Sequence, residues 1–121
     1  MTEDRLTTES VLQHHLRCFG SADLNGIISD YTEKSVLFLP SGVLRGTQEI
    51  RKHFAGMFAE FAQPGVSFEM VRQDVDGEHA YLIWKARTAN NDYEIGTDTF
   101  VIRDGKIEVH SLAWKSVPRK G

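Results

Sequence analysis

The chain has few residues that form cross-links or interrupt secondary structure, with one cysteine, Cys18, and three prolines among 121 residues. A single cysteine cannot form an internal disulfide, and no Cys/His spacing resembles a zinc site. No apolar run approaches the roughly eighteen residues that a membrane-spanning helix needs, and the first ten residues lack the basic-then-apolar order of a signal peptide. We therefore expect a soluble cytoplasmic protein that makes no contact with membranes.

Positive charge is also scarce, because 14 Lys and Arg residues stand against 17 Asp and Glu residues, for a formal net charge of −3. Binding to nucleic-acid phosphates draws on clustered Lys and Arg, and the only basic cluster is Arg119-Lys120. The composition thus argues against a nucleic-acid partner. The sequence has no glycine-rich dinucleotide motif, no P-loop and no metal cluster, so no cofactor is expected.

Hydrophobic residues make up 40% of the chain, enough for one domain over residues 1–121 with a real core. In the first half they recur at helical spacing. We predict a helix over residues 8–19 with Thr7 or Thr8 as its N-cap, and a short second helix, capped by Asp23, that runs to Asp30 or Tyr31. A third helix is predicted over about fifteen residues from Thr47 until Pro64-Gly65. A short strand over residues 35–39 lies between the last two.

From Val66 onward the period changes from 3.6 to about 2, which predicts strands. These are four consecutive antiparallel strands, over residues 66–75, 79–88, 93–103 and 106–117. Helices followed by such a meander favour an α+β layout in which the helices cover one face of a curved sheet. Tyr81 and Ile83 then lie on the outer face, which leaves that face partly apolar.

Asp98 stands in the middle of a predicted strand, with its side chain on the same face as Phe100 and Ile102. Its carboxyl group should therefore point into an apolar interior. A buried carboxyl group must be paired, hydrogen-bonded or protonated, and each of these states could serve proton chemistry or ligand recognition. A purely structural acid, bonded to Tyr31, Ser111 or a trapped water, explains the spacing equally well.

Two histidines are candidate partners for this acid, His15 on the apolar stripe of the first helix and His110 on the last strand. General acid-base work by such groups contributes roughly 10²–10⁴-fold in rate, although a core histidine is the plainer interpretation of His15. The direction of His110 depends on the preceding turn. A two-residue turn at Asp104-Gly105 pairs His110 with Thr99 and points it outward, whereas a three-residue loop over 103–105 places it opposite Asp98. We favour the three-residue loop.

The other histidines, His14, His53 and His79, are expected at the surface. Aromatic walls with few polar groups are typical of small-molecule sites. Six aromatic residues could form such a wall, although simple filling of the core also explains most of them: Phe38, Phe54, Phe58, Phe61, Trp84 and Trp114. We expect a pocket for a small apolar ligand that carries a carbonyl or hydroxyl group. The predicted lining is Tyr31, Phe38, Leu39, Phe54, Phe58, Trp84, Leu112 and Trp114.

The segments VLQHHLRCFGSADLNGIISDYTEKSVLFLPSGVLRGTQEIRKHF and DTFVIRDGKI carry a family resemblance. They resemble the NTF2-like superfamily, particularly its SnoaL-like and ketosteroid-isomerase-like branches. The specific elements are residues 23–26, Pro40 with Gly46, Asp98 with Phe100, and residues 104–107. The resemblance implies a cystatin-like, cone-shaped α+β barrel, with three helices packed in a strongly curved antiparallel sheet, and usually a homodimer through the outer face of the sheet.

Compared with ketosteroid isomerases, Asp98 falls on a protonated aspartic acid that stabilises the dienolate oxygen. His15 falls on its tyrosine partner, and Leu39 falls on the carboxylate that shuttles the proton. Leucine cannot accept a proton, so catalysis would need another base, such as His15 or His110. The resemblance thus implies an isomerase, cyclase or dehydratase without a cofactor, or else a noncatalytic ligand-binding or protein-interaction module, as NTF2 itself is.

Overall fold

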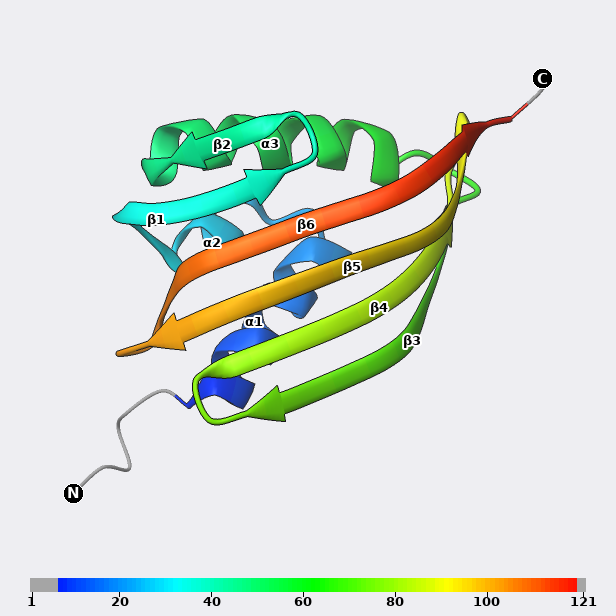
Figure 1. The fold of residues 1–121 in the computed structure, drawn as a ribbon. Helices are drawn as coiled ribbons and strands as arrows, with labels where there is room; N and C mark the ends of the chain where they lie inside the picture. Colours follow the sequence, from blue (N-terminus) through cyan, green and yellow to red (C-terminus); the bar gives the residue numbers. More distant parts are fainter. Residues whose placement is uncertain (1–6, 120–121) are drawn as a thin grey trace.

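The computed structural model describes residues 7–119 and has the expected α+β architecture. All its helices lie against one face of a single six-stranded sheet (Figure 1). The helices are α1 (Thr8–Gly20), α2 (Leu24–Ile28) and α3 (Gly46–Phe61), and the strands are β1 (Tyr31–Leu39), β2 (Gly42–Arg45), β3 (Ser67–Asp76), β4 (His79–Arg87), β5 (Asn91–Arg103) and β6 (Lys106–Pro118). None of the helices within residues 7–119 is long and apolar enough to span a membrane.

Side-chain caps fix where the first two helices begin. The Thr7 hydroxyl accepts a 3.0 Å hydrogen bond from the Ser10 amide, and the Asp23 carboxylate accepts one of 2.9 Å from the Gly26 amide. Each cap satisfies a backbone N–H group that the first turn of a helix leaves without a partner. Both residues were predicted as caps, Thr7 as one of two choices.

Helix α2 is shorter than predicted, because it ends at Ile28 and Tyr31 begins strand β1 instead. The backbone explains the early end. The Asp30 carbonyl accepts a 2.7 Å hydrogen bond from the Ile107 amide, and Tyr31 pairs with Ile107 of β6. Pairing with β6 thus extends β1 back to Tyr31, and this places the Tyr31 side chain in the core.

The sheet is mixed, with strand order β2-β1-β6-β5-β4-β3. Strands β3 to β6 form the predicted antiparallel meander, but β1 pairs in parallel with β6, so the expectation of a wholly antiparallel sheet was wrong. Strand β2 was not predicted, because its four mostly exposed residues show no alternation. The cone shape and the strong bend stay predictions.

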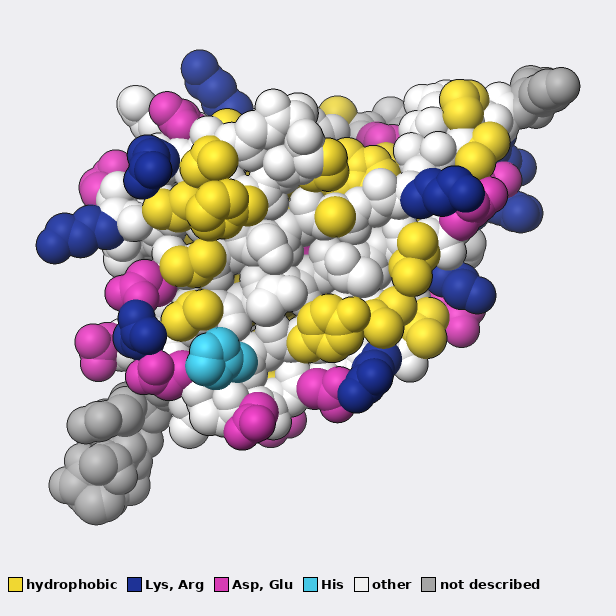
Figure 2. Space-filling view, viewed as in Figure 1, with side chains coloured by type: hydrophobic (Ala, Val, Ile, Leu, Met, Phe, Trp, Pro, Cys, Tyr) yellow, Lys and Arg dark blue, Asp and Glu magenta, His cyan; other side chains and the backbone are white. Residues whose placement is uncertain are grey.

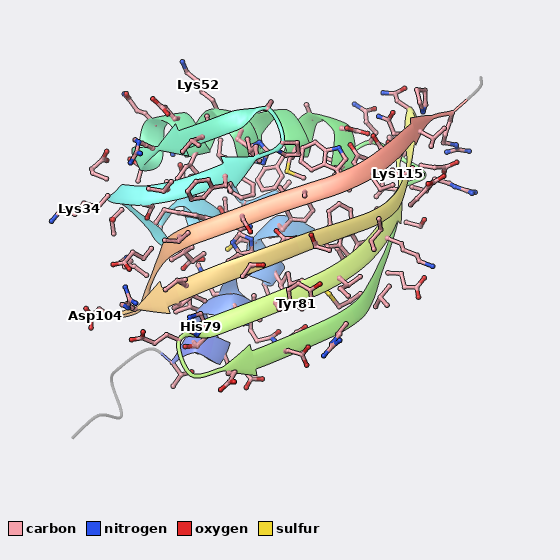
Figure 3. All side chains as sticks on the ribbon, in the orientation of Figure 1. Lys34, Lys52, His79, Tyr81, Asp104 and Lys115 are labelled. Atoms are coloured by element: carbon pink, nitrogen blue, oxygen red, sulfur yellow. The ribbon has the colours of Figure 1, made fainter. Side chains whose placement is uncertain are left out.

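Within residues 7–119, the outer face of the sheet carries no helix, and hydrophobic side chains gather on it within a rim of charged ones (Figure 2). Tyr81 lies on this face, as Figure 3 shows, and both Tyr81 and Ile83 are half-buried. Their neighbours Ala80, Leu82 and Trp84 point inward and are buried. The predicted alternation of strand β4 is therefore present.

Candidate functional site

Asp98 lies in the middle of β5, between Leu82 of β4 and Leu112 of β6 as its cross-strand partners. Asp98 is buried, with only 7% of its surface exposed to solvent. Both carboxyl oxygens have partners, because Oδ1 accepts a 2.7 Å hydrogen bond from the indole Nε1–H of Trp84 and Oδ2 lies 2.7 Å from Nε2 of His110. The buried acid is thus paired and hydrogen-bonded rather than isolated.

A glycine allows Trp84 to reach this acid. Gly96 is the cross-strand partner of Trp84, and a Cβ atom at Gly96 would collide with the indole ring. The ring therefore lies across the β5 backbone, and its N–H group points along the strand toward Asp98.

His110 faces inward, but not by the predicted loop. Asp104 and Gly105 form a two-residue turn in which both residues have positive φ, as a type I′ hairpin requires. The three-residue loop was therefore wrong. An irregularity follows in which Ile102 pairs with Ile107 while Val101 pairs with Val109, so that Glu108 is an extra residue on β6.

This bulge decides which way His110 points. It shifts the pairing by one residue, so His110 pairs with Phe100 and turns into the core, where it is 1% exposed. Asp98 is then a diagonal neighbour of His110, still within hydrogen-bond distance.

Tyr31 completes a buried chain of three polar side chains. Its hydroxyl lies 2.8 Å from Nδ1 of His110, and burial, with smaller effects of Asp98 and Asp30, raises the pKa of the phenol well above 10. The phenol thus keeps its proton and has a buried acceptor in Nδ1. We assign Tyr31 as the donor to His110 Nδ1, which leaves the proton of a neutral imidazole on Nε2, donating to Asp98.

His15 packs at the centre of the same region. Its ring lies 5.7 Å from that of His110 and 5.3 Å from that of Phe100, measured between centroids. The residue is 4% exposed, and Nδ1 is buried without a hydrogen-bond partner. Burial, with smaller effects of His110 and His14, holds the pKa of His15 well below 6.5, so the ring is neutral. A buried polar atom without a partner is costly, and this one is free to bind a ligand.

A small cavity of about 40 Å³ adjoins these groups. Asp98 and His15 are its polar lining residues, and the rest of the wall is apolar. The lining consists of His15, Leu16, Phe19, Phe54, Met57, Phe61, Phe68, Leu82, Trp84, Asp98 and Leu112.

The predicted lining agrees with this cavity in part. Phe54, Trp84 and Leu112 line it, and Tyr31 lies behind it, bonded to His110. Phe38 does not, because it pairs with Val43 at the sheet edge and is 45% exposed on the outer face. Three further predicted residues do not line the cavity but pack in or against the core: Leu39, Phe58 and Trp114.

Several lining residues escaped the sequence reasoning. Phe68 is the clearest, because an aromatic residue near the start of an exposed edge strand shows no pattern that assigns it to a pocket. Leu16, Phe19 and Met57 lie on helix faces that face the core, and helical periodicity could not separate cavity wall from solid packing.

The two remaining helix histidines differ from the expectation of simple surface positions. His14 is half-exposed and donates from Nδ1 to the Asp30 carboxylate at 2.8 Å, while its Nε2 lies 3.5 Å from the Cys18 thiol. His53 is half-buried, its Nε2 has no partner, and burial, aided by His110, lowers its pKa to about 4. His79 is exposed, as expected.

Within residues 7–119, no three His, Cys, Asp or Glu side chains converge as a metal site would require. The Tyr31–His110–Asp98 chain and His15 bring four ionisable side chains together beside one cavity. An acid with two N–H donors, facing an apolar cavity, can exchange a proton with a bound molecule while its charge stays compensated.

Three helices on one face of a six-stranded mixed sheet, with a mainly apolar pocket between the layers, define an NTF2-like or cystatin-like fold. Residues 12–110 match the model of the SnoaL-like domain, and the chain belongs to this family. A comparison with curated protein sequences finds no match.

Solved structures show the same fold at low identity. One is from Kribbella flavida DSM 17836 and is provisionally named a ketosteroid isomerase (13% identity, 100% of this chain and 87% of that chain, TM-score 0.74). Another is SalBIII, an epoxide hydrolase/cyclase-like enzyme in pyran ring formation (17%, 89% and 90%, TM-score 0.75). A third is an NTF2-like protein of unknown function from Cytophaga hutchinsonii ATCC 33406 (11%, 93% and 94%, TM-score 0.72). At these identities the likeness shows the fold alone.

Proposed function

We propose that this protein is a cofactor-independent acid-base enzyme of the isomerase or cyclase type, acting on a small apolar molecule that carries a carbonyl or hydroxyl group. One observation carries the proposal: the Asp98 carboxyl group faces an apolar cavity while His110 and Tyr31 support it from behind. Buried acids held in this way are typical of sites that move protons.

Asp98 is the general base in this proposal. Its carboxylate accepts hydrogen bonds from both Trp84 and His110. It therefore has free lone pairs that can take a proton from the substrate, but no proton of its own to donate at the start of the reaction. This differs from the ketosteroid-isomerase resemblance, in which the equivalent acid donates. Asp98 as the base also replaces the family carboxylate, whose position is occupied here by Leu39.

The proton transfer is balanced within the substrate. Asp98 takes a proton from the carbon beside the carbonyl group, and the released electron pair moves onto the carbonyl oxygen. The neutral His15 ring, which has one N–H group, stabilises that oxygen. Asp98 then returns the proton to a different carbon, giving an isomer. In a cyclase, the activated carbon instead attacks a second carbonyl carbon of the same molecule. The new C–C bond forms as the C=O π bond of that carbonyl breaks, and the resulting alkoxide takes the proton back from Asp98.

The test follows proton abstraction directly, without knowledge of the final product. Small enones and polyketide-like ketones are incubated with the protein in D₂O, and NMR measures deuterium entering beside the carbonyl group. For a compound that exchanges with the native protein, Asp98→Asn should slow the exchange by roughly 10²-fold or more. Asp76→Asn, at an exposed position on β3, is the matched control and should leave it unchanged. Exchange that survives in Asp98→Asn would remove Asp98 from the mechanism.

A second candidate function is ligand binding without turnover, and Leu39 at the position of the family carboxylate favours it. Ligands that bind beside Asp98 but show no exchange in the native protein would support this candidate over the enzyme.

A further inference from the structure

The cavity beside Asp98 is too small for the substrate it is proposed to hold. Its volume of about 40 Å³ has room for a few water molecules at most. A second cavity of about 200 Å³ lies outside it, and the two share Phe19, Phe61 and Phe68 as lining residues. These three rings therefore separate the acid from a space large enough for a small organic ring.

Of the three, Phe68 is the ring best placed to move. It lies on β3, the edge strand of the sheet, and is 45% exposed, so its displacement uncovers little buried surface. Phe68 also lines an open cleft of about 580 Å³, which offers space into which the ring can move. Phe61, by contrast, is half-buried and packs against Phe19, Trp84 and Tyr93.

Phe68 is stacked on the indole of Trp84, with centroids 5.5 Å apart and an interplanar angle of 19°. The same indole donates to Asp98. A flat ring that took the place of Phe68 would therefore lie on Trp84 with its substituents close to the acid. The side chain occupies the position that a ligand ring would take.

We propose that the ligand is an uncharged, planar, unsaturated ring compound whose ring replaces Phe68 on the face of Trp84 and whose oxygen points toward Asp98 and His15. This inference rests on the proposed function for the location of the ligand site beside Asp98. It does not depend on whether the protein catalyses a reaction there. A planar ring restores the stacking that Trp84 loses with Phe68, whereas a saturated ring of the same size cannot. Stacking of this kind corresponds to roughly 2- to 12-fold in affinity.

The experiment compares a flat and a saturated alcohol of one skeleton, 2-naphthol and decahydro-2-naphthol. The chain has two tryptophans, and Trp114→Phe identifies the indole N–H signal of Trp84 in ¹H–¹⁵N spectra. Titration should shift that signal, with 2-naphthol binding several-fold more tightly. Equal affinities, or shifts that leave the Trp84 signal untouched, would overturn the proposal.

Variants at Phe68 test the replacement itself. Phe68→Ala removes the competing ring and should tighten 2-naphthol binding several-fold, and Phe68→Leu, which keeps an apolar side chain of similar size, should do so to a smaller extent. Phe38→Ala is the matched control, because Phe38 is also 45% exposed but lies on the outer face of the sheet. Affinities that stay unchanged in both Phe68 variants, as in Phe38→Ala, would contradict the proposal.

These results separate the two proposals. If 2-naphthol binds on Trp84 as described but no ketone exchanges protons, the ring position stands and the enzyme proposal fails. If exchange depends on Asp98 while flat and saturated rings bind equally, the enzyme proposal stands and the ring position fails.

Discussion

The indole of Trp84 lies over Gly96, and this contact sets the direction of the indole N–H group, which donates a hydrogen bond to Asp98. The two residues face each other across β4 and β5, so the absence of a side chain on one strand positions a large side chain on the other. Gly96 is thus a structural requirement of the site, although it contacts no predicted ligand.

Gly96→Ala should displace the indole and break its hydrogen bond to Asp98. Forcing a methyl group into this packed contact should cost about 1–3 kcal/mol in the free energy of unfolding. Urea unfolding measures the cost, and the indole N–H signal reports the lost bond. Gly56→Ala is the control, because a Cβ there meets nothing within 4 Å and the helix position favours alanine by about 0.5–1 kcal/mol. Equal effects of the two substitutions would contradict the role of Gly96.

Tyr31→Phe removes the hydroxyl that donates to His110 Nδ1 and leaves that nitrogen buried without a partner. The expected loss is about 1–3 kcal/mol in unfolding free energy. The imidazole is then free to change tautomer, so any proton exchange that depends on Asp98 should also slow. Tyr81→Phe, on the outer face, should change neither quantity. A Tyr31→Phe protein as stable as the native one would show that the assigned donor is wrong.

The buried His15 should make stability depend on pH in a defined direction. Burial holds its pKa in the folded state well below 6.5, so only the unfolded chain takes up a proton as the pH falls below about 6.5. The free energy of unfolding should therefore decrease on acidification, by up to about 1.4 kcal/mol per pH unit from this residue.

Urea unfolding at pH 7, 6 and 5 measures this slope. His15→Gln should reduce it, while His79→Gln, at an exposed position, should leave it as it is. An unchanged slope in His15→Gln would mean that other groups account for the pH dependence.

Glu60 holds the end of α3 against the β4–β5 connection, because its carboxylate accepts hydrogen bonds from Thr88, Asn91 and Tyr93 at 2.6–2.8 Å. Glu60→Ala leaves these donors without their acceptor and should cost about 1–3 kcal/mol in unfolding free energy. The neighbouring residue is Phe61 of the cavity wall, so binding of 2-naphthol should also change. Lys52→Ala, at an exposed position on the same helix, is a control for both measurements.

The outer face of the sheet supports the proposal of a homodimer, because its apolar side chains, Tyr81 and Ile83 among them, have no covering element within the described residues. Sedimentation should show a dimer at micromolar concentration, and Ile83→Lys should convert it to a monomer. Lys34→Glu, an exposed change on β1, should not. A monomeric native protein would refute the proposal.

The sequence predicted the elements well where a strong period or a cap marks them. The apolar stripe that contains His15 and the cap at Asp23 led to α1 and α2, and alternation led to the four strands of the meander. The parallel pairing of β1 with β6 was not predictable in this way, because it joins segments far apart in the chain and no local pattern records it.

The site shows the same division. The inward position of Asp98 follows from alternation with Phe100, whereas the partner Trp84 depends on a contact with Gly96 that only the paired strands reveal. Phe68 was missed because its role comes from the rings around it and not from its place in a strand.

The extra residue Glu108 in β6 has a consequence for how this fold can change over time. A protein that lost this one residue would lose the bulge with it, and a regular hairpin would still pair His110 with Phe100 and keep it beside Asp98. A protein that kept Glu108 but paired it regularly would instead pair His110 with Thr99 and turn it toward the solvent, which would leave Asp98 with Trp84 alone. Relatives of similar shape can therefore gain or lose this proton pathway through the way the strands pair beside the turn, with no change in any residue that lines the cavity.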